Sequence, residues 1–101
     1  MNIQITSRKF KAKDSLKDFI KNEIKSLEKF NDNILDANVV LSYTHLKDSI
    51  KNVEMVIQIP GKVITVADSS EEFEKSVNAA INKVIRQLAK VKTKRIARKK
   101  A

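Results

Sequence analysis

The chain has 101 residues, of which 42% are hydrophobic and 33% charged, a balance typical of one soluble globular domain rather than a disordered segment. It contains no Cys, which excludes disulfides, thiolate metal sites and cysteine nucleophiles, and its single Gly excludes a glycine-rich phosphate-binding loop. No apolar run approaches the roughly 18 residues of a membrane span, and no signal peptide is apparent, so we expect a cytoplasmic protein.

The net charge of +9 is concentrated at one end of the chain. Residues 83–101 contain nine Lys or Arg and no acidic residue, whereas the positive and negative charges of residues 1–82 balance. A neutral body with a cationic end suits a polyanionic partner, and nucleic acid is the first candidate.

The N-terminal third predicts a strand followed by a helix. Residues 2–6 alternate apolar and polar side chains, and a basic connector at residues 7–13 leads to a helix that Asp14 or Ser15 could cap. We expect residues 31–33 to end this helix, since Asn tolerates the left-handed conformation found at helix ends. The apolar stripe of the helix comprises Leu16, Phe19, Ile20, Ile24, Leu27 and Phe30.

Three further strands follow, at residues 37–44, 53–59 and 62–67. Residues 46–49 are expected to connect the first two, and Pro60-Gly61 is a strong turn signal before the third. The side chains expected to point inward are Ala37, Val39, Leu41 and Tyr43, then Val53, Met55, Ile57 and Ile59.

The outward face of this sheet is expected to be polar and to lack an aromatic residue. Because RNA-recognition sheets stack bases on exposed rings, a stacking platform on this face is not expected. The polar residues assigned to the face are Asn2, Gln4, Asn38, Ser42, Asn52 and Gln58.

A second helix is predicted after a capping box formed by Ser69 and Glu72. The resulting order is β-α-β-β-β-α, an α+β fold in which a four-stranded sheet carries both helices on one face. We expect one domain over residues 1–95 and a frayed basic tail over residues 96–101. The apolar stripe of the second helix comprises Phe73, Val77, Ile81, Val84, Leu88 and Val91.

Basic residues form a band beside that stripe. On a helical wheel, Arg86, Lys90, Lys94 and Arg98 fall within about 60° of Lys83, so the band can meet several phosphates of a folded RNA. The first helix adds lysines at i, i+4 and i+8, and the connector before it is also basic. The candidate RNA-binding residues are Arg8, Lys21, Lys25, Lys29, Lys83, Arg86, Lys90, Lys92, Lys94 and Arg95.

The basic segments and the single His allow three other interpretations. The lysines of the first helix could be a solvated face, because acidic residues stand near them at Asp18, Glu23 and Glu28. A membrane surface could accept a basic helix, but the fold needs the large apolar side chains, which leaves no face to insert. Catalysis has no support, since the single His, His45, has no Cys or second His to share a metal; no enzyme activity, metal, cofactor or small-molecule substrate is expected.

The element order and the last helix resemble the bacterial ribosome hibernation-promoting factor family, also described as ribosome-associated translation inhibitors. The strongest match is at residues 80–92, with a Gln87-Leu88-x-Lys90-x-Lys92 core similar to the family's closing helix. Residues 27–30 and 53–61 are similar to the family's first-helix ending and to its third strand and turn.

The resemblance implies a β-α-β-β-β-α fold related in arrangement to double-stranded-RNA-binding domains. It also implies binding to ribosomal RNA of the small ribosomal subunit, between head and body, where the domain would block the mRNA and tRNA decoding channel and inhibit translation in non-growing cells. By position, Lys83, Arg86 and Lys90 match RNA-facing residues of the family's last helix, and Lys29 matches one of its first.

The chain also departs from the family pattern. Glu23 and Ser26 stand where basic residues are common, and residues 74–78 only loosely echo the family's Tyr-Ala-Ala-Ile-Asp stretch. Without a long linker and second domain the chain resembles a short form, expected to be a monomer when free and not to pair ribosomes by itself. A ribosome assembly or structural protein and a general double-stranded-RNA binder remain open as alternatives.

Overall fold

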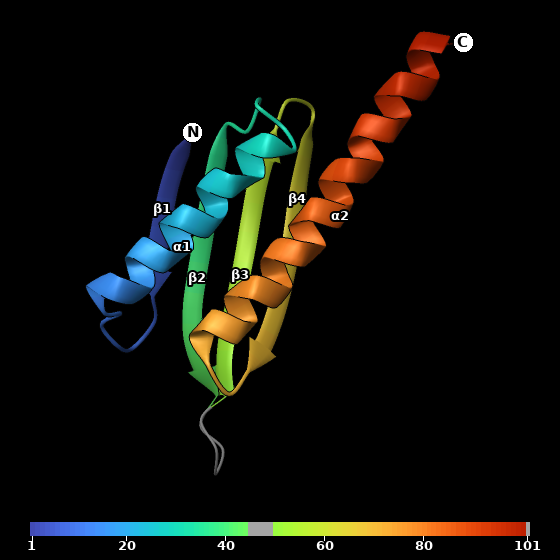
Figure 1. Cartoon of the computed structure of the whole chain (residues 1–101). Coiled ribbons are helices and arrows are strands. Elements are labelled where there is room, and N and C mark those ends of the chain that lie inside the picture. Colours follow the sequence, from blue (N-terminus) through green and yellow to red (C-terminus); the bar gives the residue numbers. More distant parts are fainter. Residues whose placement is uncertain (45–49, 101) are drawn as a thin grey trace.

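The computed structural model describes residues 1–44 and 50–100, with the side chains of the last helix described as far as Val91. The predicted connection at residues 46–49, and His45, lie outside the described residues. Figure 1 shows the element order, which confirms the predicted β-α-β-β-β-α arrangement. The elements are β1 (Asn2–Ser7), α1 (Asp14–Ser26), the 3-10 turn η1 (Leu27–Lys29), β2 (Asp36–Thr44), β3 (Ile50–Ile59), β4 (Lys62–Ser70) and α2 (Phe73–Lys100).

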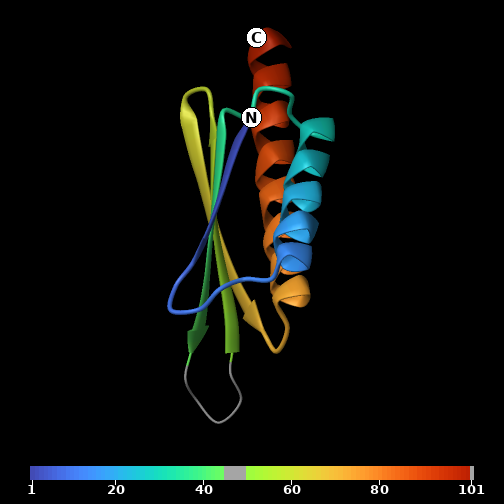
Figure 2. The ribbon, with the colours of Figure 1, turned by 90° about the vertical axis from the view of Figure 1, so that its left-hand side faces the viewer.

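The four strands form one mixed sheet in the order β1-β2-β3-β4. β1 pairs in parallel with β2 through the crossover that contains α1, and β2-β3-β4 is an antiparallel meander. Both helices cover the same face of the sheet, as Figure 2 shows edge-on, and the other face is open. This two-layer arrangement is the one that the apolar stripes predicted.

The core lies between the sheet and the helices. The inward-facing residues predicted for β2 and β3 are buried there, except Tyr43, which is half-buried. α1 contributes Ile20 and Ile24, and α2 contributes the apolar stripe from Phe73 to Leu88. The buried residues therefore follow the periods predicted for the strands and for the helices.

The hairpin between β3 and β4 turns at Pro60-Gly61 as predicted. Gly61 has φ +77°, a left-handed conformation that glycine adopts without a Cβ penalty. β4 continues to Ser70, beyond the predicted end at residue 67.

The first helix begins at Asp14, where the helical spacing of the sequence begins, but the capping residues predicted for its two ends are wrong. Its N-cap is Lys13, which has no side-chain capping bond, so neither Asp14 nor Ser15 caps it. At the other end α1 stops at Ser26 and tightens into η1. Among the described residues only Lys9 and Gly61 have positive φ, so no Asn takes the left-handed conformation; instead the Asn33 N–H donates to Asn31 Oδ1 at 2.8 Å.

The predicted capping box before α2 is also wrong, because Ser69 and Ser70 still belong to β4. The hydroxyl of Ser70, not Ser69, accepts a hydrogen bond from the Glu72 N–H at 3.3 Å. Ser76, one turn into α2, is fully buried and donates to the Lys51 carbonyl at 2.8 Å. The start of α2 is therefore anchored by hydroxyls that reach back to the sheet.

Three of the aromatic residues pack together in a cluster, whereas Phe30 is exposed. Phe10, assigned to a loop by the sequence, packs against Tyr43 and Phe73 with ring centroids 4.6 and 5.4 Å away. The apolar period of the sequence places Phe30 in the buried stripe, and this prediction is wrong, because its side chain is 42% exposed. The polar residues assigned to the open face are exposed or half-buried there, and no aromatic side chain belongs to that face among the described residues.

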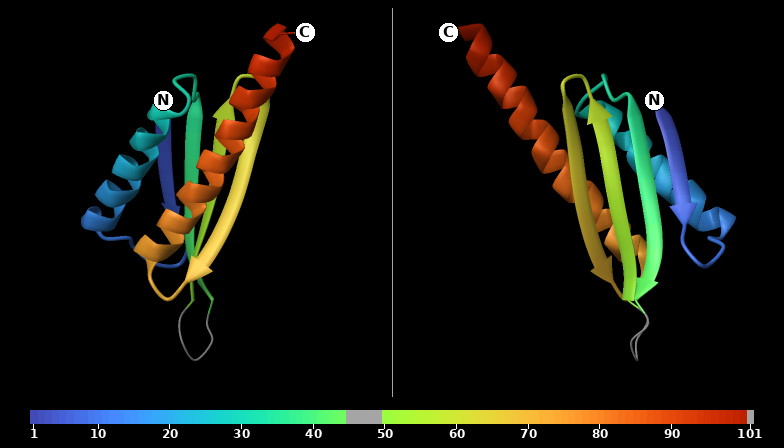
Figure 3. Two further views of the ribbon diagram at one scale, coloured as in Figure 1. Left: turned by 45° about the vertical axis from the view of Figure 1, so that its right-hand side comes forward. Right: turned by 180° about the vertical axis from the view of Figure 1, so that it is seen from behind.

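The last helix is longer than the sheet that supports it. It has 28 residues, and Figure 3 shows its C-terminal turns projecting beyond the strands. The helix reaches Lys100, past the predicted domain boundary at residue 95. Fraying of residues 96–101 stays a prediction.

Candidate nucleic-acid interface

The exposed side of α2 carries three of the predicted cations in one row. Lys83, Arg86 and Lys90 are exposed, and all three line an open groove between α2 and β4. Their orientation follows from the buried residues between them, because Val84 and Leu88 fix the opposite side of the helix in the core. Thr65, Val66 and Ala67 form the β4 wall of the groove.

Lys83 is already engaged by the body of the domain. Its Nζ lies 3.0 Å from Oδ2 of Asp68 and donates a hydrogen bond of 2.8 Å to the backbone carbonyl of Ala67. The hydrogen bond from Lys83 lowers the pKa of Asp68 below its ordinary value of 3.8, against the opposing effect of burial. The cationic segment has no acidic residue of its own, so the sequence did not reveal this partner from β4.

The first helix supplies a second group of lysines. Lys21 and Lys25 are exposed on α1, and Lys29 is exposed in η1, so the predicted i, i+4, i+8 row crosses from an α-helix into a 3-10 turn. α1 and α2 lie side by side on the sheet, as Figures 1 and 3 show. The two helices therefore present their cations on the same layer of the domain.

Acidic residues stand near these lysines in α1 and η1. Ion pairs among the described side chains include Lys83–Asp68 and Lys75–Glu72. The predicted neighbours in α1 and η1 take part in neither. The solvated-face interpretation of the first helix therefore stays open as an alternative.

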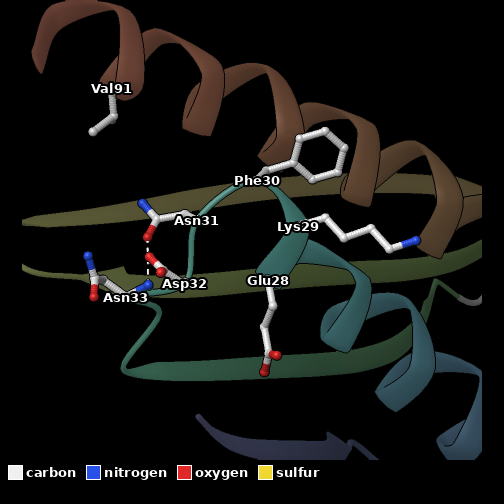
Figure 4. A pocket seen from close by; sticks show the side chains of 7 residues that line it. All are labelled: Glu28, Lys29, Phe30, Asn31, Asp32, Asn33 and Val91. Carbon is white, nitrogen blue, oxygen red and sulfur yellow. Dashed lines mark hydrogen bonds between the residues drawn. The ribbon is translucent and has the colours of Figure 1, made fainter. Parts of the chain in front are cut away.

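Lys29 lies where the two helices meet. Together with Phe30, Asn31 and Val91 it lines an open pocket of about 270 Å³, whose remaining wall is Glu28, Asp32 and Asn33. Figure 4 shows this pocket between the end of η1 and the α2 ribbon. Nothing in the sequence pattern indicated the pocket, because the helical period placed Phe30 in the core.

The structure does not place the other predicted RNA-binding residues on the cationic surface of the two helices. Arg8 is exposed after β1 and lines hollows with Ser42 and Asn52 of the open sheet face, so it is separated from the helical cations by the sheet. Lys92, Lys94 and Arg95 belong to the described α2 backbone, but their side chains lie outside the described part. Their role stays a prediction.

Other kinds of site receive no support from the described residues. They contain no group of three His, Cys, Asp or Glu side chains that could hold a metal ion. No helix in the described part of the chain combines the length and the apolar character needed to span a membrane. The candidate site is the cationic surface of α2 and α1, on the exposed residues described above.

The chain matches a protein-family model along almost its entire length. The family described as "Sigma 54 modulation protein / S30EA ribosomal protein" matches residues 3–96, and the chain belongs to this family. It is 29% identical over 94 residues to the ribosome hibernation promotion factor of Bacillus subtilis, covering 93% of this chain but half of that protein. It is 26% identical over 98 residues to the ribosome hibernation promoting factor of Azotobacter vinelandii, covering 97% of this chain and 89% of that protein.

Solved structures share the fold. A ribosomal subunit interface protein from Coxiella burnetii superposes with a TM-score of 0.84 at 22% identity, covering 92% of this chain and 99% of that chain. The N-terminal domain of Thermus thermophilus Protein Y gives a TM-score of 0.81 at 22% identity, covering 90% and 99%. The mixed four-stranded sheet with two helices on one face is thus an arrangement that solved proteins adopt.

Proposed function

We propose that this member of the S30EA ribosomal protein family is a ribosome hibernation factor. It binds the small ribosomal subunit in the mRNA and tRNA decoding channel and inhibits translation sterically in non-growing cells, acting in the cytoplasm as a monomer without catalysis. The names of the Bacillus subtilis and Azotobacter vinelandii relatives support a hibernation role. Binding in the decoding channel is what the family resemblance implies.

The observation that carries the proposal is the exposed row of Lys83, Arg86 and Lys90 along the groove beside β4. The buried stripe of α2 holds this row on a rigid scaffold, so its spacing of about one helical turn matches a fixed array of phosphates rather than any flexible anion. The long α2 and the adjacent α1 together offer a surface wider than one phosphate. Ribosomal RNA supplies a fixed array of this kind.

The test is co-sedimentation of the purified protein with vacant ribosomes, with and without bound messenger and initiator tRNA. A long RNA duplex serves as the competing ligand. We expect saturable one-to-one binding that messenger and tRNA abolish and that duplex RNA competes for poorly. Seven to nine phosphate contacts would give a log–log salt slope of roughly −5 to −8.

Two results would favour the alternatives. Equal affinity for plain duplex RNA would indicate a general double-stranded-RNA binder. Binding that is indifferent to messenger and tRNA, with near-stoichiometric amounts on subunits from growing cells, would indicate an assembly or structural protein.

A further inference from the structure

Phe30 is exposed in a domain that otherwise covers its aromatic rings. Its side chain is 42% exposed, whereas Phe73 is buried and Phe10, Phe19 and Tyr43 are half-buried. The core closes without Phe30, because Leu27 before it is fully buried and Ile34 after it is 5% exposed. Packing therefore does not account for a phenylalanine at this position.

The backbone around Phe30 is held in place. The Phe30 N–H donates to the Leu27 carbonyl at 2.9 Å, and the Asn31 N–H donates to the same carbonyl at 3.1 Å. A hydrogen bond from the Asn33 backbone to the Asn31 side chain then closes the following turn. An exposed ring on a fixed backbone loses little entropy when a flat ligand stacks on it.

The ring is one wall of a pocket whose opposite wall is the basic helix. Figure 4 shows Phe30 directed towards α2, with Val91 projecting from α2 above Asn31 and Asn33. The volume of about 270 Å³ is below the roughly 300–1,000 Å³ of pockets for drug-sized ligands, a size that suits a single planar ring system.

The polar groups at the pocket are those that a nucleobase edge requires. Glu28 and Asp32 accept hydrogen bonds, as N–H and amino groups of bases donate them, while the asparagine amides can both donate and accept. The two carboxylates disfavour a lone phosphate inside the pocket. Lys29 at its wall favours a phosphate just outside it.

We propose that Phe30 is a stacking platform for one unpaired nucleobase of the RNA that the cationic helices bind. This inference rests on the proposed function, since the cations supply the phosphate contacts and the pocket adds a base contact between η1 and α2. Stacking on an aromatic ring tolerates any base, and the carboxylates favour an edge that carries N–H donors. The contact is aromatic, so it adds affinity that salt does not screen.

The first test compares Phe30→Leu with the unmodified chain for binding to vacant small ribosomal subunits. Leu keeps an apolar side chain but removes the ring face, and we expect affinity about 5- to 100-fold weaker with an unchanged salt slope. Circular dichroism and thermal unfolding check that the fold is retained. Failure of the unmodified chain to bind would refute the proposed function, whereas equal binding of Phe30→Leu would refute this inference alone.

The second test uses the absence of Trp from the chain. Phe30→Trp places one indole at the platform, and Val63→Trp places a control indole at a 55% exposed position on β4. Both variants should bind small subunits, and only the Phe30→Trp emission should be quenched on binding. Unchanged emission of the Phe30→Trp variant on binding would overturn the inference. Brighter and blue-shifted emission would also overturn it, because it would indicate that a side chain of a ribosomal protein, such as Arg, fills the pocket in place of a base.

Discussion

Lys83 and Asp68 join α2 to β4 through an ion pair of 3.0 Å between Nζ and Oδ2. The same ammonium group also donates to the Ala67 carbonyl, so it has two partners within the domain before any RNA arrives. Lys83 remains exposed, and its pair is therefore a weak competitor for a phosphate rather than a permanent bond.

Replacing Asp68 by Asn should strengthen RNA binding. The substitution removes the acidic competitor and frees the ammonium of Lys83 for phosphate. Exposed ion pairs contribute about 0.2–1 kcal/mol, so we expect roughly a 1.5- to 5-fold gain in affinity for vacant small subunits. Binding measured by sedimentation at two salt concentrations checks this, and weaker binding of the variant would show that Asp68 positions Lys83 instead.

Reversing the charge of the row should abolish tight binding. The triple variant Lys83→Glu, Arg86→Glu and Lys90→Glu removes three phosphate contacts, which should lower the salt slope by at least about 2 and release translation from inhibition. A matched triple reversal at Lys11, Lys13 and Lys75 has the same charge change at the end of the domain where α2 begins. If both triples lost affinity equally, net charge rather than the α2 row would control binding.

The Asp68 carboxylate should contribute to stability in a defined pH range. Because its folded pKa lies below the ordinary value of 3.8, the contribution is present above pH 3.8 and is lost as the pH falls through the lowered pKa. The difference in unfolding free energy between the unmodified chain and Asp68→Asn should thus be larger at about pH 6 than at about pH 3. Urea unfolding at both values measures it, and a pH-independent difference would contradict the role of this ion pair.

Replacing Ser70 by Ala should lower the unfolding free energy more than replacing its neighbour Ser69. Ser70→Ala removes the hydroxyl that accepts from the Glu72 N–H at the start of α2, and we expect a loss of about 1 kcal/mol in unfolding free energy. Ser69→Ala changes an exposed β4 side chain and should stay within about 0.5 kcal/mol. Equal losses of unfolding free energy for the two variants would contradict the assignment of this capping contact to Ser70 rather than Ser69.

The parts of the fold that the sequence predicted are those in which burial alternates with a fixed period. β2 and β3 show this, because their inward-facing residues, such as Val39 and Ile57, are buried and the residues next to them in sequence face the open side of the sheet. Element ends were predicted less well. At α1 and α2 the choice among adjacent Ser, Asp and Asn depends on which side chain reaches a free N–H in three dimensions, as Ser70 does.

For the candidate site, the sequence predicted which cations share a helix face but not what lies opposite them. Asp68 is distant in sequence from Lys83, and no spacing rule connects a strand residue with a helix residue. Phe30 continues the apolar period of the sequence, but it follows η1 as the C-cap residue, where the helical period no longer applies, and its side chain is exposed. The pocket therefore became visible only with the fold.

The parallel pairing of β1 has a consequence for how the domain opens. β1 contacts the sheet on one side only, its apolar residues Ile3 and Ile5 are half-buried, and its partner β2 lies a whole crossover away in sequence. Closing that loop is entropically harder than closing the β3–β4 hairpin. We expect β1 amides to exchange with solvent through local detachment, well before those of β3, in native-state hydrogen exchange. Such detachment would leave the meander and α2 in place, so the cationic row would keep its geometry while the N-terminal edge fluctuates.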